Sequence, residues 1–287
     1  MNGILLIDKP AGLTSHAVVA WLRKILDIKR IGHAGTLDPA ATGLLVILVG
    51  SATKLFPYLS DLDKEYEGEV TIGVSTDTLD AEGNITAVKE VEGEIAADEA
   101  LISLLGEREQ APPMFSAIKS AGKKLYELAR KGIEIERRPR AIAVYDLKRI
   151  SPVVYENGRA RFSFYTRVSK GTYIRTLSAE IGEKLGFPAH LSALRRLSVG
   201  SFSVREASGL EEVSAGNFSL LKMLSAFPED RVVRPAEEVV LKARAGRPLA
   251  IEETGSAAAA IAIASGGELV AVYKLKNGRY YPERVWN

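Results

Sequence analysis

The sequence contains no cysteine in its 287 residues. Disulfide bonds, thiolate zinc sites and cysteine nucleophiles are therefore excluded, and this composition is typical of cytoplasmic proteins. Histidine is also scarce, and His16, His33 and His190 are too scattered to indicate a metal site, so we expect none. The first apolar run ends at Asp8, far too early to form a signal or membrane-spanning segment. These absences predict a soluble cytoplasmic protein that does not act at a membrane.

An excess of charge of either sign is missing as well. The chain has 38 basic and 36 acidic residues, which leaves a formal net charge of +2. Its 46% hydrophobic and 26% charged residues are ordinary for a globular protein, and its length suits one large domain with a smaller one. The net charge gives no global signal for nucleic acid, so any RNA contact must come from local basic patches.

Residues 32–43 form the most informative stretch. Its glycines and its proline predict a loop, and the apolar run of residues 44–49 that follows predicts a buried strand. Asp38 is the only acidic residue between Asp27 and Asp61. Neither a Walker phosphate loop nor a dinucleotide-binding glycine pattern is present, and no second acid nearby suggests a glycosidase pair. The residues alone leave two interpretations of Asp38, a nucleophile or a structural turn.

The order His-Ala-Gly-Thr-Leu-Asp-Pro-Ala-Ala-Thr-Gly over residues 33–43 resembles the active-site motif of the bacterial tRNA pseudouridine synthase B family. The resemblance implies that Asp38 is a nucleophile that attacks a uridine, whose glycosidic bond breaks before the uracil turns and rejoins the ribose through carbon 5. It implies no cofactor and no metal. One departure is Ala34, where many relatives have threonine. The opening segment, residues 3–16, resembles the family's N-terminal motif, which places Lys9 beneath the catalytic loop, where it could also meet a phosphate.

Tyr66 lies at the start of an alternating segment, residues 64–73, that predicts a strand with one polar face. A tyrosine at such a position is more often a core aromatic than a catalytic one. The segment resembles the family's Lys-x-Tyr motif, which implies instead that the ring of Tyr66 stacks on the target base and that its hydroxyl helps to move the carbon 5 proton.

Residues 169–177 predict a loop that opens a helix, and Lys170 and Arg175 favour an anion near its first turn. A surface arginine is the plain interpretation of Arg175. The order Lys-Gly-Thr-Tyr-Ile-Arg resembles a family motif, which implies that Arg175 pairs with Asp38 and that Tyr173 forms a wall of the base pocket. A guanidinium in that place would hold the carboxylate ionised, with its pKa pushed down.

Two further residues gain roles only from the resemblance. Leu194 would be a core residue by itself, and the family implies that it contacts the base. His33 would be a loop histidine, and the family implies that it fills the space left by a flipped nucleotide. The polar, acidic residues 75–83 are interpreted as a solvated or scaffold loop without a function of their own.

A basic insertion is expected at about residues 107–140. Its prolines, Pro112 and Pro113, exclude a regular element there, and many lysines and arginines follow. Such a charge run is usually a solvated face. The Pro-Pro-x-x-Ser-Ala-x-Lys order resembles the family's RNA-gripping insertion.

The predicted fold is mixed α+β, with a largely antiparallel central sheet and flanking helices. Residues 140–150 and 159–168 are expected to pair as antiparallel strands, and residues 201–205 to form another strand. We expect a catalytic domain over residues 1–229 with the pseudouridine synthase fold. Residues 230–287 are expected to form a small all-β domain that resembles a PUA RNA-binding module, or else a β-cap that only stabilises the protein.

The resemblance as a whole implies a monomeric isomerase that needs no protein partner and acts on the T stem-loop of tRNA, at uridine 55. The base must leave the folded loop before it can react. Attack at carbon 6 of the base and attack at the ribose anomeric carbon both stay open. Two other classes are kept as alternatives: a non-catalytic RNA chaperone, and a hydrolase or phosphotransferase that uses Asp38 covalently.

Overall fold

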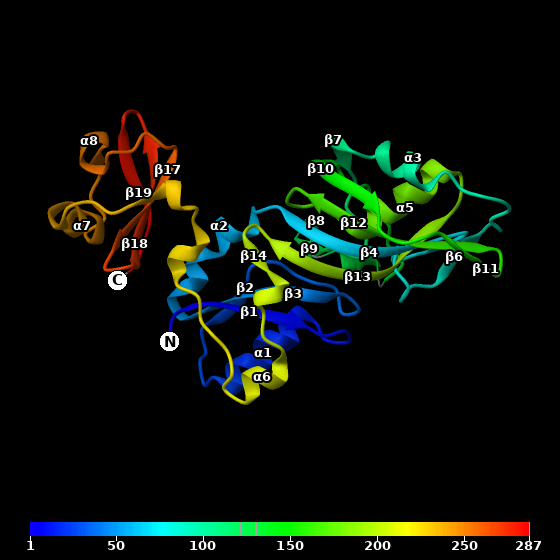
Figure 1. The fold of residues 1–287 in the computed structure, drawn as a ribbon, viewed down its shortest axis with the longest axis horizontal. Helices are drawn as coiled ribbons and strands as arrows, with labels where there is room; N and C mark the ends of the chain where they lie inside the picture. Colours follow the sequence, from blue (N-terminus) through cyan, green and yellow to red (C-terminus); the bar gives the residue numbers. More distant parts are fainter. Residues whose placement is uncertain (117, 121, 130, 287) are drawn as a thin grey trace.

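A ten-stranded mixed sheet runs through most of the computed structural model, which describes residues 1–116, 118–120, 122–129 and 131–286 (Figure 1). Its main order is β1-β3-β13-β4-β12-β10-β7, with β2 beside β3, β14 beside β13 and β11 beside β12. Among the described pairings of this sheet only β3 with β13 is parallel, so the predicted fold class is confirmed. The strands are β1 (Gly3–Lys9), β2 (Ile31–His33), β3 (Thr42–Val49), β4 (Lys64–Ile72), β7 (Gly106–Gln110), β10 (Arg140–Arg149), β11 (Val154–Glu156), β12 (Arg159–Val168), β13 (Ala189–Val199) and β14 (Phe202–Ser203).

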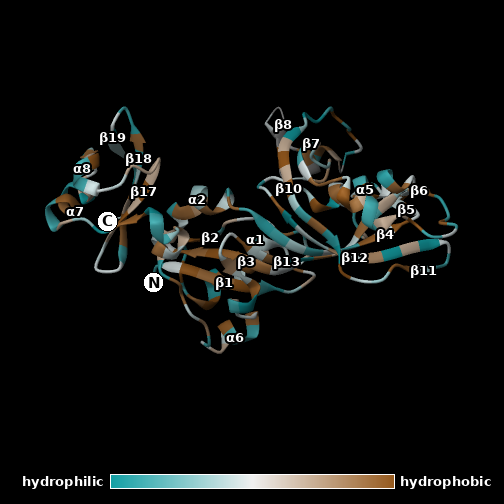
Figure 2. Cartoon of the chain, turned by 45° about the horizontal axis from the view of Figure 1, so that its top comes forward, coloured by the Kyte–Doolittle hydropathy of each residue, from teal (hydrophilic) through white to brown (hydrophobic). Residues whose placement is uncertain are grey.

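Strand β3 is buried on both faces, which explains its unbroken apolar sequence. Leu44, Val46 and Leu48 belong to one core cluster, and Leu45 and Ile47 belong to another on the opposite face of the sheet. Figure 2 shows the same hydrophobic colouring along β1 and β3. Each such side chain contributes about 1.5–3 kcal/mol on burial. The loop that carries Asp38 is therefore attached to one of the most firmly held strands.

Helices lie against the faces of the sheet. Helix α1 (Ser15–Ile25) begins at Thr14, whose hydroxyl accepts a hydrogen bond from the Ala17 amide, and it packs on β1 and β3. Helix α5 (Ile174–Leu185) ends at Gly186, where φ is +76°, and packs on β4, β12 and β13. The shorter helices are α2 (Phe56–Ser60), α3 (Ala97–Ile102), α4 (Leu125–Ala129) and α6 (Leu210–Ser214), with 3-10 turns η1 (Gly50–Leu55), η2 (Val204–Glu206), η3 (Met223–Ala226) and η4 (Glu229–Arg231). No helix among the described residues is long and apolar enough to cross a membrane.

The parallel seam between β3 and β13 is short, with Thr42 opposite Arg195 and Gly43 opposite Arg196. Gly43 has a φ of +95°, and a Cβ at this position would stand 2.3 Å from the backbone oxygen of Arg196. Only glycine therefore lets the strand that follows the Asp38 loop approach β13 this closely.

The C-terminal segment forms a five-stranded sheet of its own, in the order β15-β17-β18-β19-β16. The expectation that this segment is all-β is wrong, because it also contains helices α7 (Glu237–Arg244) and α8 (Ile251–Thr254). Trp286 is 5% exposed, shares a core cluster with β3, and donates its indole N–H to the Ser51 oxygen at 3.2 Å. The domain boundary near residue 230 stays a prediction. The strands are β15 (Val232–Val233), β16 (Leu249–Ala250), β17 (Ala260–Ser265), β18 (Glu268–Lys276) and β19 (Arg279–Val285).

Two details of the predicted strands need correction. The segment 201–205 holds only the two-residue β14 followed by a 3-10 turn, whereas the preceding eleven-residue strand β13 lies in the middle of the sheet and was not predicted. Strands β10 and β12 pair as expected, but the turn at Asn157 joins β12 to the short strand β11. Two small hairpins complete the described strands, β5 (Val74–Thr76) with β6 (Ile85–Val88), and β8 (Lys119–Ser120) with β9 (Lys123–Lys124).

Candidate active site

Asp38 lies in the loop between β2 and β3, and its side chain is 43% exposed, so a substrate can reach it. Its Oδ2 forms an ion pair with Arg175 Nε at a distance of 3.0 Å. Arg175 stands in the first turn of α5 and is only 6% exposed. The structure thus brings together the two residues that the sequence analysis paired, while their roles in a reaction stay predictions.

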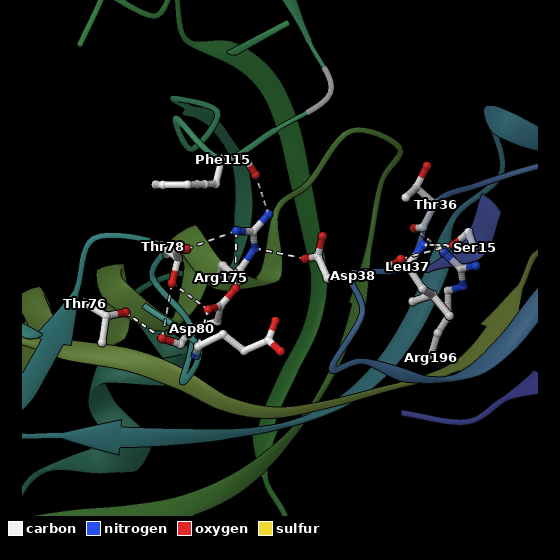
Figure 3. Close-up of polar contacts among 11 residues, drawn as sticks. Ser15, Thr36, Leu37, Asp38, Thr76, Thr78, Asp80, Phe115, Arg175 and Arg196 are labelled. Carbon is white, nitrogen blue, oxygen red and sulfur yellow. Dashed lines mark hydrogen bonds and ion pairs between the residues drawn. The ribbon is translucent and has the colours of Figure 1, made fainter. Parts of the chain in front are cut away.

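The guanidinium of Arg175 is held on every side (Figure 3). Its Nη1 donates to the Thr78 carbonyl at 3.0 Å and lies 3.4 Å from Asp80 Oδ2. Its Nη2 donates to the Phe115 carbonyl at 2.8 Å. A planar fork with fixed donors suits such an arrangement, and a lysine ammonium would satisfy only part of it. Arg175 therefore presents a fixed positive edge to Asp38.

The sequence analysis missed Asp80, which it placed in a loop without a function. The Thr78 hydroxyl donates to Asp80 Oδ1 at 2.5 Å, and the Thr76 hydroxyl donates to the Asp80 carbonyl at 2.6 Å. At Gly83 a Cβ would meet the Thr78 hydroxyl oxygen at 2.2 Å. This tight packing holds a second carboxylate against Arg175, and nothing in the local sequence pattern signals it.

Burial raises the pKa of Asp38 above its ordinary value, and the Arg175 guanidinium opposes this as the next largest influence. The carboxylate of Asp80 raises the pKa further, and Lys9 lowers it. The expectation that the pKa of Asp38 is pushed down is therefore wrong. Arg175 acts in the expected direction, but the loss of water around the carboxylate outweighs it.

Lys9 lies beneath the loop, as the resemblance implied. Its side chain is fully buried, and its Nζ donates to the carbonyls of Pro10, Leu13 and Pro39 at 2.9, 2.7 and 3.1 Å. Burial lowers the pKa of Lys9, and Asp38 is the largest opposing influence. The suggestion that Lys9 could meet a phosphate is wrong, because its ammonium is enclosed by backbone oxygens.

The other predicted pocket residues lie on β4, on β13 and just before α5. Tyr66 on β4 is 8% exposed, and Leu194 on the adjacent strand β13 packs against the same core cluster. Tyr173 immediately precedes α5, and its backbone is held at both ends by Gln110, which accepts from the Tyr173 amide at 2.8 Å and donates to the Tyr173 carbonyl at 3.3 Å. The sequence analysis gave Gln110 no role. Burial raises the pKa of the Tyr173 hydroxyl.

His33 lies at the end of β2. Burial lowers its pKa, followed by the charges of Arg196 and His16, so the ring is favoured in its neutral form. Its Nδ1 is buried without a hydrogen-bond partner among the described residues. The structure gives His33 no contact with Asp38, and its predicted role beside a flipped nucleotide stays a prediction.

The insertion predicted over residues 107–140 contains β7, the small hairpin and α4. Phe115 connects it to Arg175 as described above, and Arg137 Nη1 donates to the Pro112 carbonyl at 3.3 Å. Residues 117, 121 and 130 lie outside the described part of the chain, as do several basic side chains of the predicted sector. Among the residues that are described, no cluster of His, Asp or Glu is arranged to hold a metal ion.

Comparison with known proteins identifies the family. Residues 23–174 match the family model described as TruB family pseudouridylate synthase (N terminal domain), and residues 175–241 match the model described as tRNA pseudouridylate synthase B C-terminal domain. The chain belongs to the TruB family. Proteins named tRNA pseudouridine synthase B resemble this TruB chain over the full length of both sequences, at 43% identity in Streptococcus pneumoniae serotype 4 and 44% in Streptococcus sanguinis.

Solved structures agree with the TruB fold. A Cbf5-Nop10-Gar1 complex contains a chain that superposes with a TM-score of 0.74 at 26% identity, covering 99% of this chain and 84% of that one. A structure of an H/ACA RNP bound to a substrate RNA containing 2'-deoxyuridine gives a TM-score of 0.74 at 25% identity, covering 99% and 85%. The likeness therefore extends over both the ten-stranded and the five-stranded sheet of the TruB chain.

Proposed function

We propose that this protein isomerises uridine to pseudouridine at position 55 in the T loop of tRNA, without a cofactor, with Asp38 as the nucleophile. The observation that carries the proposal is the ion pair between Asp38 and the buried Arg175, in a chain of the TruB family. The names of its full-length relatives support tRNA as the substrate and pseudouridine formation as the reaction.

The contacts around Asp38 support a nucleophilic role. The attacking group must be ionised, and Arg175 favours that form by its charge while burial opposes it. Because the guanidinium is fixed by Asp80 and two backbone carbonyls, it orients the carboxylate without having to reorganise during the reaction. In the proposed reaction Asp38 forms a bond to the nucleotide, the bond between the ribose and nitrogen 1 breaks, and a bond from the ribose to carbon 5 forms. The carbon 5 proton is lost to solvent, nitrogen 1 takes up a proton, and the bond to Asp38 breaks again, so that the product is an isomer of uridine and the carboxylate is restored.

The target uridine must leave the stacked T loop before Asp38 can reach it. This extrusion costs roughly a few kcal/mol and is offset by stacking and backbone contacts in the protein. Tyr66, Tyr173 and Leu194 are the side chains proposed to hold the base, and His33 is proposed to fill the gap in the loop. A neutral, half-buried imidazole with an unpartnered Nδ1 suits insertion among bases.

Tritium release tests the proposal. A tRNA transcript labelled with tritium at carbon 5 of uridine is mixed with excess protein, with and without a chelator. We expect release of one tritium per tRNA, indifferent to the chelator, and none from a transcript that carries cytidine at position 55. Asp38→Asn should abolish release, whereas Asp61→Asn, an exposed aspartate paired with Lys170, should not change it.

Two outcomes would contradict the proposal. Tritium release by folded Asp38→Asn at the wild-type rate would remove Asp38 from the chemistry. Tight tRNA binding by the wild type without any release would leave an RNA-binding role in place of catalysis at this site.

A further inference from the structure

Arg196 is among the largest of the described side chains that are almost fully buried, with 2% of its surface exposed. It stands on β13, opposite Gly43 of β3. No carboxylate forms an ion pair with it among the described residues, and its described hydrogen bonds all go to backbone carbonyls. A buried charge is costly unless its donors are satisfied, and here backbone carbonyls satisfy them.

The carbonyls that Arg196 binds lie on both sides of Asp38. Its Nη2 donates to Gly35 at 3.1 Å, its Nη1 to Thr36 at 3.3 Å and its Nε to Leu44 at 2.7 Å. The guanidinium thus joins the beginning of the loop that carries Asp38 to Leu44, near the start of β3. Figure 3 shows Arg196 on the opposite side of Asp38 from Arg175.

Neighbouring carbonyls of the loop are held by other elements. Ser15 at the start of α1 donates to the Leu37 carbonyl at 3.1 Å and accepts from the Leu37 amide at 2.8 Å. Lys9 donates to the Pro39 carbonyl, as described above. The Asp38 carbonyl accepts from the amide of Ala41, within the loop itself, at 3.2 Å. The backbone from Gly35 to Pro39 therefore has a hydrogen bond at each residue, and the Asp38 side chain extends from it to Arg175.

We propose that Arg196 is a positioning residue for the reaction, whose three-carbonyl clamp sets the place and direction of the Asp38 carboxylate. This inference rests on the proposed function, because it assigns Arg196 an effect on the step that Asp38 performs. Arg196 touches neither the substrate nor Asp38 itself. It acts through the loop backbone, and a shift of about 1 Å in a reacting group costs on the order of 100-fold in rate.

The clamp requires an arginine. Lysine keeps the charge, but its ammonium is a compact point charge that cannot reach carbonyls on both sides of the loop. Arg195, the next residue, provides a matched control, because it is half-exposed and forms a two-pronged ion pair with Asp8 at 3.0 and 2.7 Å. Both residues lie on the same strand and at the same seam, but the Arg196 side chain binds the carbonyls of Gly35 and Thr36, whereas the Arg195 side chain binds Asp8.

The test compares Arg196→Lys, Arg196→Gln and Arg195→Lys with the wild type in single-turnover tritium release, in tRNA binding and in hydrogen exchange of residues 33–43. We expect both Arg196 variants to bind tRNA with unchanged Kd and to react on the order of 100-fold more slowly. The amides of residues 33–43 should exchange faster in these variants alone. Arg195→Lys should match the wild type in all three measurements.

A wild-type rate in folded Arg196→Lys would overturn the inference, as would an equal loss of rate in Arg195→Lys or a loss of tRNA affinity that accounts for the slower reaction. If neither Arg196 variant folds, Arg196 is a stability residue and the inference also fails. Asp38→Asn is measured alongside. An inactive wild type or an active Asp38→Asn would contradict the proposed function, whereas an active wild type, an inactive Asp38→Asn and a fully active Arg196→Lys would contradict only the positioning role.

Discussion

Replacing Gly43 with alanine tests whether the close approach of β3 to β13 stabilises the fold and also holds the loop that carries Asp38 in its conformation. The added Cβ would lie 2.3 Å from the oxygen and 2.8 Å from the nitrogen of the Arg196 backbone, and these atoms belong to a paired strand and cannot rotate away. The φ of +95° costs an alanine about 1 kcal/mol, the lower end for a strained backbone. Forcing the two strands apart costs a further 1–3 kcal/mol, as overpacking typically does. We therefore expect Gly43→Ala to lower the free energy of unfolding by about 2–4 kcal/mol.

The control for backbone strain alone is Gly216→Ala. Gly216 has a φ of +80°, and a Cβ there would meet nothing within 4 Å. Urea unfolding should show a loss of about 1 kcal/mol for this variant, and the difference between the two isolates the clash at the seam. Single-turnover tritium release should fall for Gly43→Ala, since the shift moves Arg196 and the loop, and should not change for Gly216→Ala. Equal losses of stability in the two variants, or a fully active Gly43→Ala, would refute this reasoning.

Four further predictions follow from the site and from the five-stranded sheet. Burial raises the pKa of Asp38, so the folded protein holds a proton there more tightly than the unfolded chain, and the ionised group destabilises the fold at pH 7. Asp38→Asn should therefore raise the unfolding midpoint at pH 7, although it abolishes the proposed activity. The gain in midpoint should shrink as the pH falls through the pKa of Asp38. A lower midpoint at pH 7 would contradict the raised pKa. Because the proposed reaction needs the ionised carboxylate of Asp38, the acidic limb of the pH-rate profile should lie above the ordinary aspartate pKa of about 3.9. In Asp80→Asn that limb should move to lower pH, since Asp80 raises the pKa of Asp38, and an upward move would show that loosening of Arg175 dominates. Trp286→Ala should cost about 3–5 kcal/mol in urea unfolding, and a loss under 1 kcal/mol, as expected for the exposed Tyr281→Ala, would contradict the shared core.

The sequence predicted those parts of the fold whose signals are local. Strand β3 follows from its apolar run, and the start of α5 follows from the loop predicted over residues 169–177. Helix α7 was missed although it has a local signal, with acidic residues in its first turn and basic ones in its last. Strand β13 was missed because Arg195 and Arg196 interrupt its apolar residues. Arg196 is nevertheless buried, because it binds carbonyls that are distant in the sequence.

The candidate site divides in the same way. The pairing of Asp38 with Arg175 was predicted through motifs in which each residue stands among recognisable neighbours. Asp80 and Arg196 could not be predicted from such motifs. The partner of Asp80, Arg175, is 95 residues away in the chain, and the carbonyls that Arg196 binds are up to 161 residues away. Moreover, Arg196 binds backbone carbonyls, which every residue possesses and which leave no trace in the sequence. The direction of the pKa shift of Asp38 was likewise mispredicted, since burial depends on the whole fold.

The seam between β3 and β13 also bears on how the enzyme becomes active as it folds. Strands β1, β2 and β3 are close in sequence and can pair early. The hydrogen bonds from Arg196 to the Asp38 loop and to β3 join residues 152 to 161 positions apart, so a long stretch of chain must close before they form. A partly folded chain with a native-like β1–β3 core would therefore carry Asp38 on a loop without its fixed shape. Recovery of catalysis during refolding should follow the docking of β13, the late long-range step, and lag behind the formation of secondary structure.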